Sequence, residues 1–116
     1  MTPCKQGDVV LLPFPFTNLR TTKQRPAVVL SSDAFNAGRQ DVIVLAITSQ
    51  IPASLNAEDY PLSTEDQRLA GLPKPSIVKT GKLLTIDQRL IRKVLGRLPE
   101  PTLAHLKQRL LSVLGG

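Results

Sequence analysis

An arginine and a threonine are the clearest candidates for chemistry in this sequence. Arg25 stands directly before the apolar segment 26–32, PAVVLSS, and Thr48 ends the apolar segment 41–48, DVIVLAIT. A guanidinium group can donate two parallel hydrogen bonds to a phosphate, and a hydroxyl group can donate a third. Such preorganised donors stabilise the negative charge that develops on a phosphorane oxygen. The pair therefore indicates a phosphate site, provided that the two side chains meet.

The two segments have the features of neighbouring strands. Both are short, rich in Val, Ile and Leu, and bounded by turn residues. If they pair antiparallel, the start of the first lies beside the end of the second, and Arg25 faces Thr48. Pro26 restricts the backbone of the arginine to the extended region and would hold it at the mouth of its strand. Without this pairing Arg25 is a solvated charge at a sheet edge, an alternative that the two segments alone leave open.

Further segments predict a small, mostly antiparallel β-barrel with appended helices. Segment 50–75 is rich in proline and polar residues, and we expect a loop there with one strand near Tyr60. Other strand patterns cover 8–14, 75–86 with Gly81 as a turn or bulge, and, more weakly, 92–98.

Helical patterns are fewer. The longest lies near the C-terminus, where Pro101 suits the first helical position and Gly115 ends the pattern. Segment 31–38 can open with a serine cap and close on a glycine, which fits one helical turn. Segment 85–92 can hold another short helix. The apolar residues of the long helix recur at helical spacing, namely Leu103, Leu106, Leu110, Val113 and Leu114.

The residue inventory excludes several classes of site. The chain has 116 residues, which fits one domain covering 1–116, and it contains one cysteine and one histidine. These numbers allow no internal disulfide and no zinc site, and no carboxylates are spaced as a magnesium cluster. There is no P-loop or dinucleotide fingerprint, and the aromatic residues are few for a base-stacking platform. We therefore expect neither a metal nor another cofactor.

The net charge of +6 is unevenly distributed along the chain. Residues 74–116 carry nine Lys or Arg and two acidic residues, whereas residues 1–73 carry six and seven. A basic half favours a polyanionic partner, either a nucleic acid or an acidic protein segment, although the same charge could serve solubility alone. No apolar run approaches the roughly 20 residues of a membrane span, and the first residues lack the apolar region of a signal peptide. We expect a cytoplasmic protein without a membrane partner.

Nearly the whole chain carries short motifs in a recognisable order. The stretches are GDVVLLPFPFTNLRTTKQRPAVVLSS, VIVLAITSQ and SIVKTGKLLTIDQRLIRKVLGRL. The motifs within them are Gly7-Asp8, Phe14-Pro15-Phe16-Thr17, Arg25-Pro26, Ile47-Thr48-Ser49 and Thr85-Ile86-Asp87. In this order and spacing they resemble the MazF/PemK family of toxin–antitoxin endoribonucleases.

This resemblance implies a fold and an activity. The fold would be a small SH3-like antiparallel β-barrel with short helices and a C-terminal α-helix, assembled as a homodimer. The activity would be sequence-specific, metal-independent cleavage of single-stranded RNA, in which the ribose 2′-hydroxyl attacks the adjacent phosphate and leaves a 2′,3′-cyclic phosphate and a 5′-hydroxyl. The family's catalytic arginine and threonine match Arg25 and Thr48. Arg25 would stabilise the pentacoordinate phosphate and is a candidate for proton transfer, and Thr48 would hold a phosphate oxygen.

RNA recognition and partners follow from the same resemblance. The loop 15–24 would gate the RNA groove, and Thr17 and Asn18 are candidate base readers because their side chains both donate and accept hydrogen bonds. The expected partner is a cognate antitoxin with an acidic, disordered tail, and toxin and antitoxin together would bind DNA. The other residues assigned to RNA binding are Gln24, Ser49, Gln50, Lys79 and Lys82.

Departures from the family pattern concern RNA recognition more than catalysis. Many members have Asp where this chain has Asn18, and paired glycines where it has TKQ at 22–24. The sequence GKLL at 81–84 stands where others have Glu-Gln-x-Arg, so that Lys82 replaces an RNA-contacting glutamine and the arginine is absent.

Two alternatives to a nuclease remain, because a fold does not define a function. One is a CcdB-like toxin of the same fold that binds and poisons DNA gyrase without cutting nucleic acid. The other is a decayed toxin that only binds RNA or its antitoxin. Arg25 together with Thr48, and the basic C-terminal half, favour the nuclease.

Overall fold

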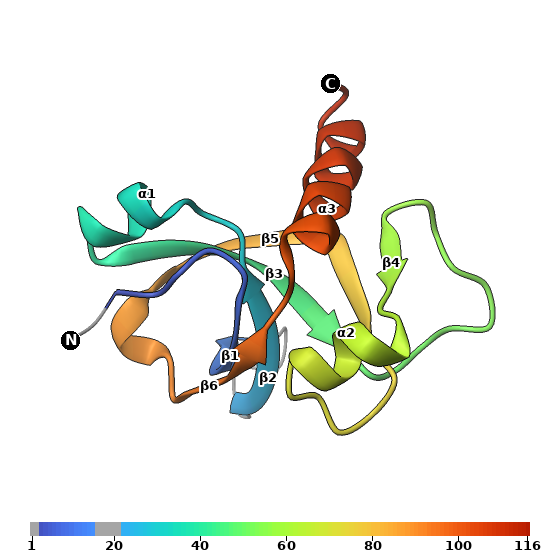
Figure 1. Ribbon diagram of the computed structural model, residues 1–116, viewed down its shortest axis with the longest axis horizontal. Coiled ribbons are helices and arrows are strands. Elements are labelled where there is room, and N and C mark those ends of the chain that lie inside the picture. The colour runs from blue at the N-terminus through green and yellow to red at the C-terminus, as the bar shows by residue number, and fades with distance from the viewer. Residues whose placement is uncertain (1–2, 16–21) are drawn as a thin grey trace.

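The computed structural model describes residues 3–15 and 22–116, which form one antiparallel sheet with helices packed around it (Figure 1). The six strands of this part of the chain follow the order β4-β5-β3-β2-β1-β6. None of the described helices is both long and apolar enough to cross a membrane. The strands are β1 (Asp8–Pro15), β2 (Thr22–Val29), β3 (Asp41–Thr48), β4 (Asp59–Pro61), β5 (Ile77–Asp87) and β6 (Lys93–Arg97). The helices are α1 (Asp33–Ala37), α2 (Thr64–Leu69), the 3-10 helix η1 (Gln88–Leu90) and α3 (Glu100–Val113).

The predicted fold class is confirmed, but the barrel is not closed. Among the described strands, β4 and β6 are the two edges of the sheet and do not pair with each other. The turn after α2 covers β6 instead. A Cβ atom at Gly71, whose φ is +71°, would overlap the carbonyl group of Leu95, and one at Gly96 would overlap the backbone at the end of α2. The end of α2 thus packs closely against β6, and the sheet formed by the described strands stays open.

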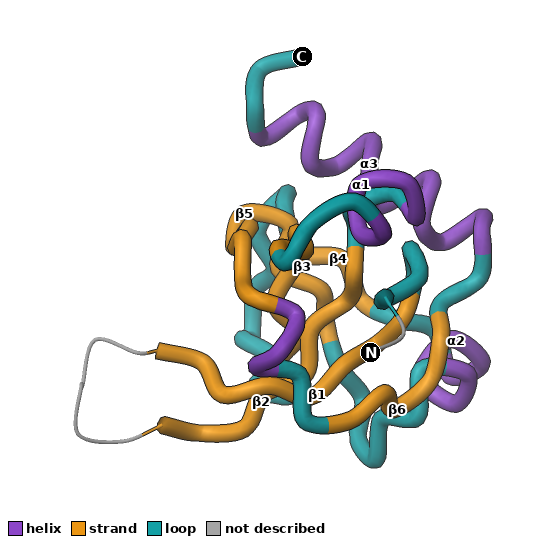
Figure 2. The backbone as a smooth tube through the Cα atoms, turned by 90° about the vertical axis from the view of Figure 1, so that its left-hand side faces the viewer, coloured by secondary structure: helices purple, strands orange, loops and turns teal. Residues whose placement is uncertain are grey.

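Strand β2 differs from the prediction at both ends. It begins at Thr22, four residues before the predicted segment 26–32, and ends at Val29. The earlier start has a tertiary cause, because pairing with β1 continues up to Thr22 and forms a hairpin that extends beyond the rest of the sheet (Figure 2). Ser32 leaves the sheet to cap α1. Arg25 therefore lies within a strand and not at its mouth.

Segment 75–86 forms a single strand, β5, with the irregularity predicted near Gly81. The pairing with β3 changes register between Leu45, which lies opposite Leu83, and Ala46, which lies opposite Lys79. Residues 80–82 are the extra residues of the bulge. Because of this bulge, the part of β5 that begins at Leu83 pairs with β3 in a different register from the part that ends at Lys79.

The predicted helices are present, and one further helix was missed. The serine cap of α1, the short helix within 85–92 and the long C-terminal helix are all confirmed. Segment 50–75 contains the predicted strand near Tyr60, but also α2. Ser63 caps α2 by accepting a hydrogen bond of 3.0 Å from the backbone N–H of Asp66. A serine followed three residues later by a carboxylate is a sequence signal for a helix start, and it was present in the sequence.

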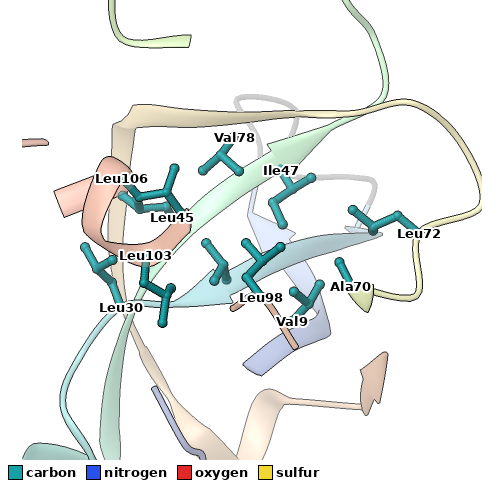
Figure 3. Packing of buried hydrophobic residues seen from close by; sticks show 11 residues of the cluster. Val9, Leu30, Leu45, Ile47, Ala70, Leu72, Val78, Leu98, Leu103 and Leu106 are labelled. Carbon is teal, nitrogen blue, oxygen red and sulfur yellow. The ribbon is translucent and has the colours of Figure 1, made fainter. Parts of the chain in front are cut away.

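Two apolar clusters on opposite faces of the sheet form the core. The helix-side cluster packs the sheet against α3 (Figure 3). Side chains of β3 alternate between the faces, so that Leu45 and Ile47 join the helix-side cluster, whereas Val44 and Ala46 join the opposite cluster. The helix-side cluster comprises Val9, Val28, Leu30, Leu45, Ile47, Ala70, Leu72, Val78, Leu98, Leu103 and Leu106. The opposite cluster comprises Val10, Leu12, Ala27, Val29, Val42, Val44 and Ala46.

Candidate functional site

The register of β2 and β3 brings Arg25 and Thr48 to the same end of the sheet. The two strands pair antiparallel, with Ala27 opposite Ala46. This is the last pair of the register, and Arg25 and Thr48 each lie two residues beyond it, at the same end of the two strands. Both side chains are half-buried and both line one hollow of about 230 Å³. The antiparallel neighbourhood that the sequence predicted for these two residues is therefore present.

Both side chains also point to the same face of the sheet. Arg25 is two residues from Ala27, and Thr48 is two residues from Ala46, and both alanines belong to the opposite cluster. Because side chains alternate along a strand, the arginine and the threonine share that face. The alanines have short side chains, and Ala46 forms part of the lining of the hollow. The sheet thus leaves open space where the guanidinium and hydroxyl groups converge.

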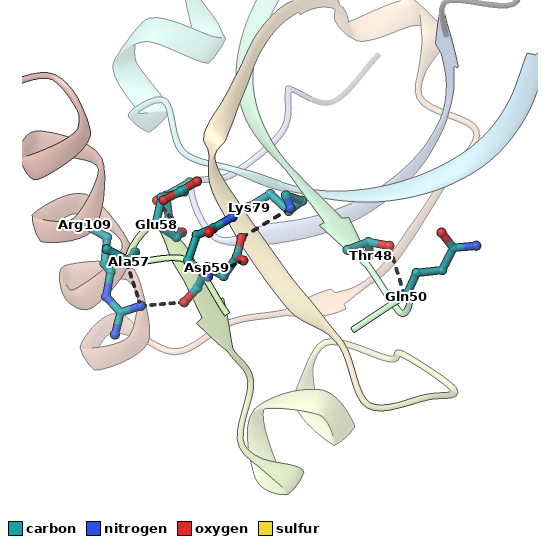
Figure 4. Close-up of polar contacts among 9 residues, drawn as sticks. Thr48, Gln50, Ala57, Glu58, Asp59, Lys79 and Arg109 are labelled. Atoms are coloured by element: carbon teal, nitrogen blue, oxygen red, sulfur yellow. Dashed lines mark hydrogen bonds and ion pairs between the residues drawn. The ribbon is translucent and has the colours of Figure 1, made fainter. Parts of the chain in front are cut away.

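The hydroxyl group of Thr48 has a fixed orientation. Its Oγ1 accepts a hydrogen bond of 3.1 Å from the backbone N–H of Gln50, in the turn that follows β3 (Figure 4). A hydroxyl that accepts through one lone pair still has its own proton to donate. Thr48 can therefore donate to an anion in the hollow, and the exposed side chain of Gln50 lines the same space.

Two lysines add positive charge to this hollow. Lys79 lies opposite Ala46 on β5, and Lys82 is exposed in the bulge of the same strand. Both line the hollow with Arg25. The Nζ atom of Lys79 is 3.4 Å from Oδ1 of Asp59 on β4 (Figure 4). The hollow thus combines three cations with one hydroxyl donor, which is an arrangement suited to a polyanion.

A second hollow adjoins the first and shares Arg25 and Thr48 with it. Its volume is about 270 Å³. Gln24 and Ser49, which the sequence assigned to RNA binding, line this second hollow and are both exposed. Lys74 lines it as well, although the sequence indicated this lysine only as part of the basic half. Arg25 and Thr48 therefore lie where two hollows meet.

Of the residues assigned from the sequence, two cannot be compared with the structure. Thr17 and Asn18 lie in 16–21, outside the described residues. Within the described ranges, no three His, Cys, Asp or Glu side chains gather as a group that could hold a metal ion. The candidate site therefore consists of the residues that line the two hollows.

The Thr85-Ile86-Asp87 motif has a structural part in this fold. The Asp87 carboxylate accepts a hydrogen bond from the backbone N–H of Arg89 and forms an ion pair of 2.7 Å with its guanidinium group. The side-chain hydrogen bond from Arg89 lowers the pKa of Asp87. The next residue, Gln88, is buried, and its amide bonds the backbone of Cys4 and of Asn36. This motif ties η1 to α1 and to the N-terminal segment, away from the two hollows.

Comparison with known proteins assigns a family to this chain. The family model of PemK-like, MazF-like toxins of type II toxin–antitoxin systems matches residues 5–114. The chain belongs to this family. Among curated proteins, no sequence matches the chain.

Solved structures of the same fold include members of the family. A MazF crystal structure from Deinococcus radiodurans is 25% identical, with a TM-score of 0.77 and coverage of 98% of each chain. An endoribonuclease from Mycobacterial species, in complex with its cognate antitoxin, is 17% identical, with a TM-score of 0.77 and coverage of 97% of this chain and 95% of its own. The Mycobacterium tuberculosis toxin MazF-mt6 is 18% identical, with a TM-score of 0.75 and coverage of 93% of this chain and 96% of its own. The family's fold therefore extends over nearly the whole chain.

Proposed function

We propose that this toxin is an endoribonuclease that cleaves single-stranded RNA without a metal ion. Arg25 and Thr48 are its catalytic residues. The observation that carries the proposal is the convergence of these two side chains on one hollow, at the same end of β2 and β3. Family membership supports the reaction type, and the three cations of the hollow support a polyanionic substrate.

The chemistry follows from the donors that the hollow presents. The ribose 2′-oxygen attacks the adjacent phosphorus, and the bond from phosphorus to the 5′-oxygen breaks. The products are a 2′,3′-cyclic phosphate and a 5′-hydroxyl, with the proton of the 2′-hydroxyl lost and one gained by the 5′-oxygen. Arg25 donates to the phosphorane oxygens as their charge develops and is the candidate for proton transfer to the leaving oxygen. Thr48, oriented by the Gln50 N–H, donates to a further oxygen.

Binding of the RNA strand extends over both hollows. Gln50, Lys79 and Lys82 contact the strand on one side of the scissile phosphate, and Gln24 and Ser49 contact it on the other. Both sides are needed, because a strand that is cut internally has a nucleotide on each side of the phosphate. Arg25 lies within β2 and directly before the rigid ring of Pro26, so little ordering of this residue remains for the reaction step.

The partners are a second copy of the chain and an antitoxin. The endoribonuclease from Mycobacterial species is in complex with its cognate antitoxin, which supports the assignment of such a partner here. An acidic, disordered antitoxin tail pairs with the cations of the hollow and gains its structure on binding. The toxin is a cytoplasmic homodimer, and with its antitoxin it binds DNA.

The test is incubation of the purified protein with a long single-stranded RNA in the presence of EDTA. The expected result is discrete fragments that carry 2′,3′-cyclic phosphate and 5′-hydroxyl ends. Intact RNA, together with inhibition of DNA gyrase by the same preparation, would instead establish a gyrase poison. Binding of RNA without either effect would establish a decayed toxin.

A further inference from the structure

The aspartate beside Lys79 is fully buried. The exposed fraction of the Asp59 side chain is 0%, and that of Lys79 is 27%. One carboxylate oxygen of Asp59, Oδ2, accepts a hydrogen bond of 3.0 Å from the backbone N–H of Asn56. The other, Oδ1, has no hydrogen-bond partner among the described residues and lies 3.4 Å from the Lys79 ammonium. A buried carboxylate is therefore aimed at a cation that reaches the edge of the candidate site.

This ion pair contributes little to stability as such. Desolvation of two charges offsets most of their attraction, and apolar residues of similar volume often serve a fold equally well. The effect of the ion pair is to fix the position of the Lys79 ammonium group. Lysine has a long side chain with many rotamers, and a fixed counter-charge restricts the ammonium to one position. That position is at the wall of the hollow that contains Arg25 and Thr48.

The position of Asp59 is itself fixed from several sides. Its backbone N–H donates to the carbonyl oxygen of Asn56, and its carbonyl oxygen accepts a hydrogen bond of 2.6 Å from Arg109 on α3. Arg109 also donates to the carbonyl oxygen of Ala57 (Figure 4). The end of the β3–β4 connection is thus clamped between β5 and α3, and Asp59 is a rigid support for Lys79.

We propose that Asp59 is a positioning residue of the RNA site: its buried carboxylate holds the Lys79 ammonium where it binds a phosphate next to the scissile one. This inference rests on the proposed function, because it assumes that the hollow takes RNA. It predicts that removal of this negative charge changes RNA affinity in the direction opposite to that expected from charge alone. Removal of a negative charge beside a cationic hollow should strengthen the binding of a polyanion by simple electrostatics. Loss of a positioning carboxylate should weaken it.

The experiment compares Asp59→Asn with the neighbouring variant Glu58→Gln. Glu58 is half-buried, and no ion pair joins it to Lys79 in the described part of the chain. Both variants remove one negative charge from adjacent residues. We expect Asp59→Asn to raise KM for RNA cleavage roughly tenfold, the equivalent of one charge-assisted hydrogen bond, with kcat within about twofold of wild type. Glu58→Gln should leave KM unchanged or lower it.

A fall in KM for Asp59→Asn, like that of the control, would overturn the proposal. Circular dichroism shows whether Asp59→Asn is folded, and if it is not, a second pair of variants decides. The second pair of variants is Lys79→Met with and without Asp59→Asn. If Asp59 acts through Lys79, the double variant has the KM of Lys79→Met, and a further rise would contradict the proposal. Lys79→Met alone leaves the buried Asp59 carboxylate without its counter-charge, whereas the double variant removes both charges, so the double variant tests the idea even if Asp59→Asn alone does not fold.

Failure of the proposed function gives a different result. If wild-type protein leaves RNA intact, the endoribonuclease assignment fails, and the comparison is made by fluorescence anisotropy with the same RNA. Weaker binding by Asp59→Asn than by Glu58→Gln then still supports positioning of Lys79 for a phosphate. Equal or tighter binding by Asp59→Asn overturns it.

Discussion

Ala46 lies opposite Lys79 across β3 and β5, two residues before Thr48. The short alanine side chain is 93% buried and forms part of the lining of the hollow that the lysine and threonine share. A larger side chain at this point of β3 would enter that hollow. The open space of the site therefore depends on an alanine that takes no part in the chemistry.

Replacement of this alanine by valine should reduce RNA cleavage without unfolding the protein. The added methyl groups fill the hollow, and displacement of the reacting groups by about 1 Å can cost on the order of 100-fold in rate. Overpacking of the core should cost about 1–3 kcal/mol of stability. Single-turnover rates and thermal melts of Ala46→Val, beside the exposed-site control Ala104→Val, separate the two effects. Wild-type cleavage by Ala46→Val would show that the substrate does not enter this hollow.

Thr48 should be needed for its hydroxyl group and not for its shape. Thr48→Val keeps the branched side chain but removes the donor, and Thr48→Ala removes both. We expect each to lower kcat by roughly 100-fold or more, a typical loss for one donor to a transition-state oxyanion. Thr48→Ser should retain most of the activity. If the valine variant cleaves RNA as fast as the serine variant, the hydroxyl group has no part in catalysis.

Lys82 distinguishes a contact to the RNA backbone from a contact to a base. It is exposed in the β5 bulge, so its removal should affect the fold little. If Lys82 neutralises a phosphate, Lys82→Ala lowers the slope of log affinity against log salt by about 0.7. If it contacts a base, the cleavage sequence changes and the slope changes only slightly. Sequencing of cut ends and a salt titration of binding decide between these, and no change in either would remove Lys82 from the site.

The homodimer is a prediction from the family and can be tested without RNA. We expect light scattering at micromolar concentration to give twice the mass of one chain. Leu111 on α3 and Leu114 directly after it are exposed, so this end of the chain has apolar surface that a second copy could cover. A monomeric mass at these concentrations would contradict the predicted assembly.

The parts of the fold that were predicted correctly are those with local signals. β3 is a continuous apolar run, α1 has its serine cap, and α3 has a helical repeat with a proline near its start. The early start of β2 was not predicted, because residues 22–25 are polar and become a strand only through pairing with β1. The open edges of the sheet were not predicted, because they depend on which strands pair, and no local pattern carries that information.

The candidate site shows the same division. Antiparallel pairing of two obvious strands was enough to bring Arg25 beside Thr48. The ion pair between Asp59 and Lys79 could not be predicted, because it depends on the pairing of a three-residue strand, β4, with β5. The position of Lys74 in the second hollow could not be predicted either, because it follows from the path of the chain between α2 and β5.

If Arg25 stabilises the charge on the scissile phosphate, removal of its side chain should abolish cleavage. The measurement is the single-turnover cleavage rate of a single-stranded RNA in EDTA by wild type, Arg25→Ala and the exposed-arginine control Arg92→Ala. Wild type and Arg92→Ala should cleave at similar rates, whereas Arg25→Ala should show no detectable cleavage while keeping a cooperative thermal melt. Cleavage by Arg25→Ala at the wild-type rate, or wild-type activity that appears only when magnesium or manganese is added, would contradict the account.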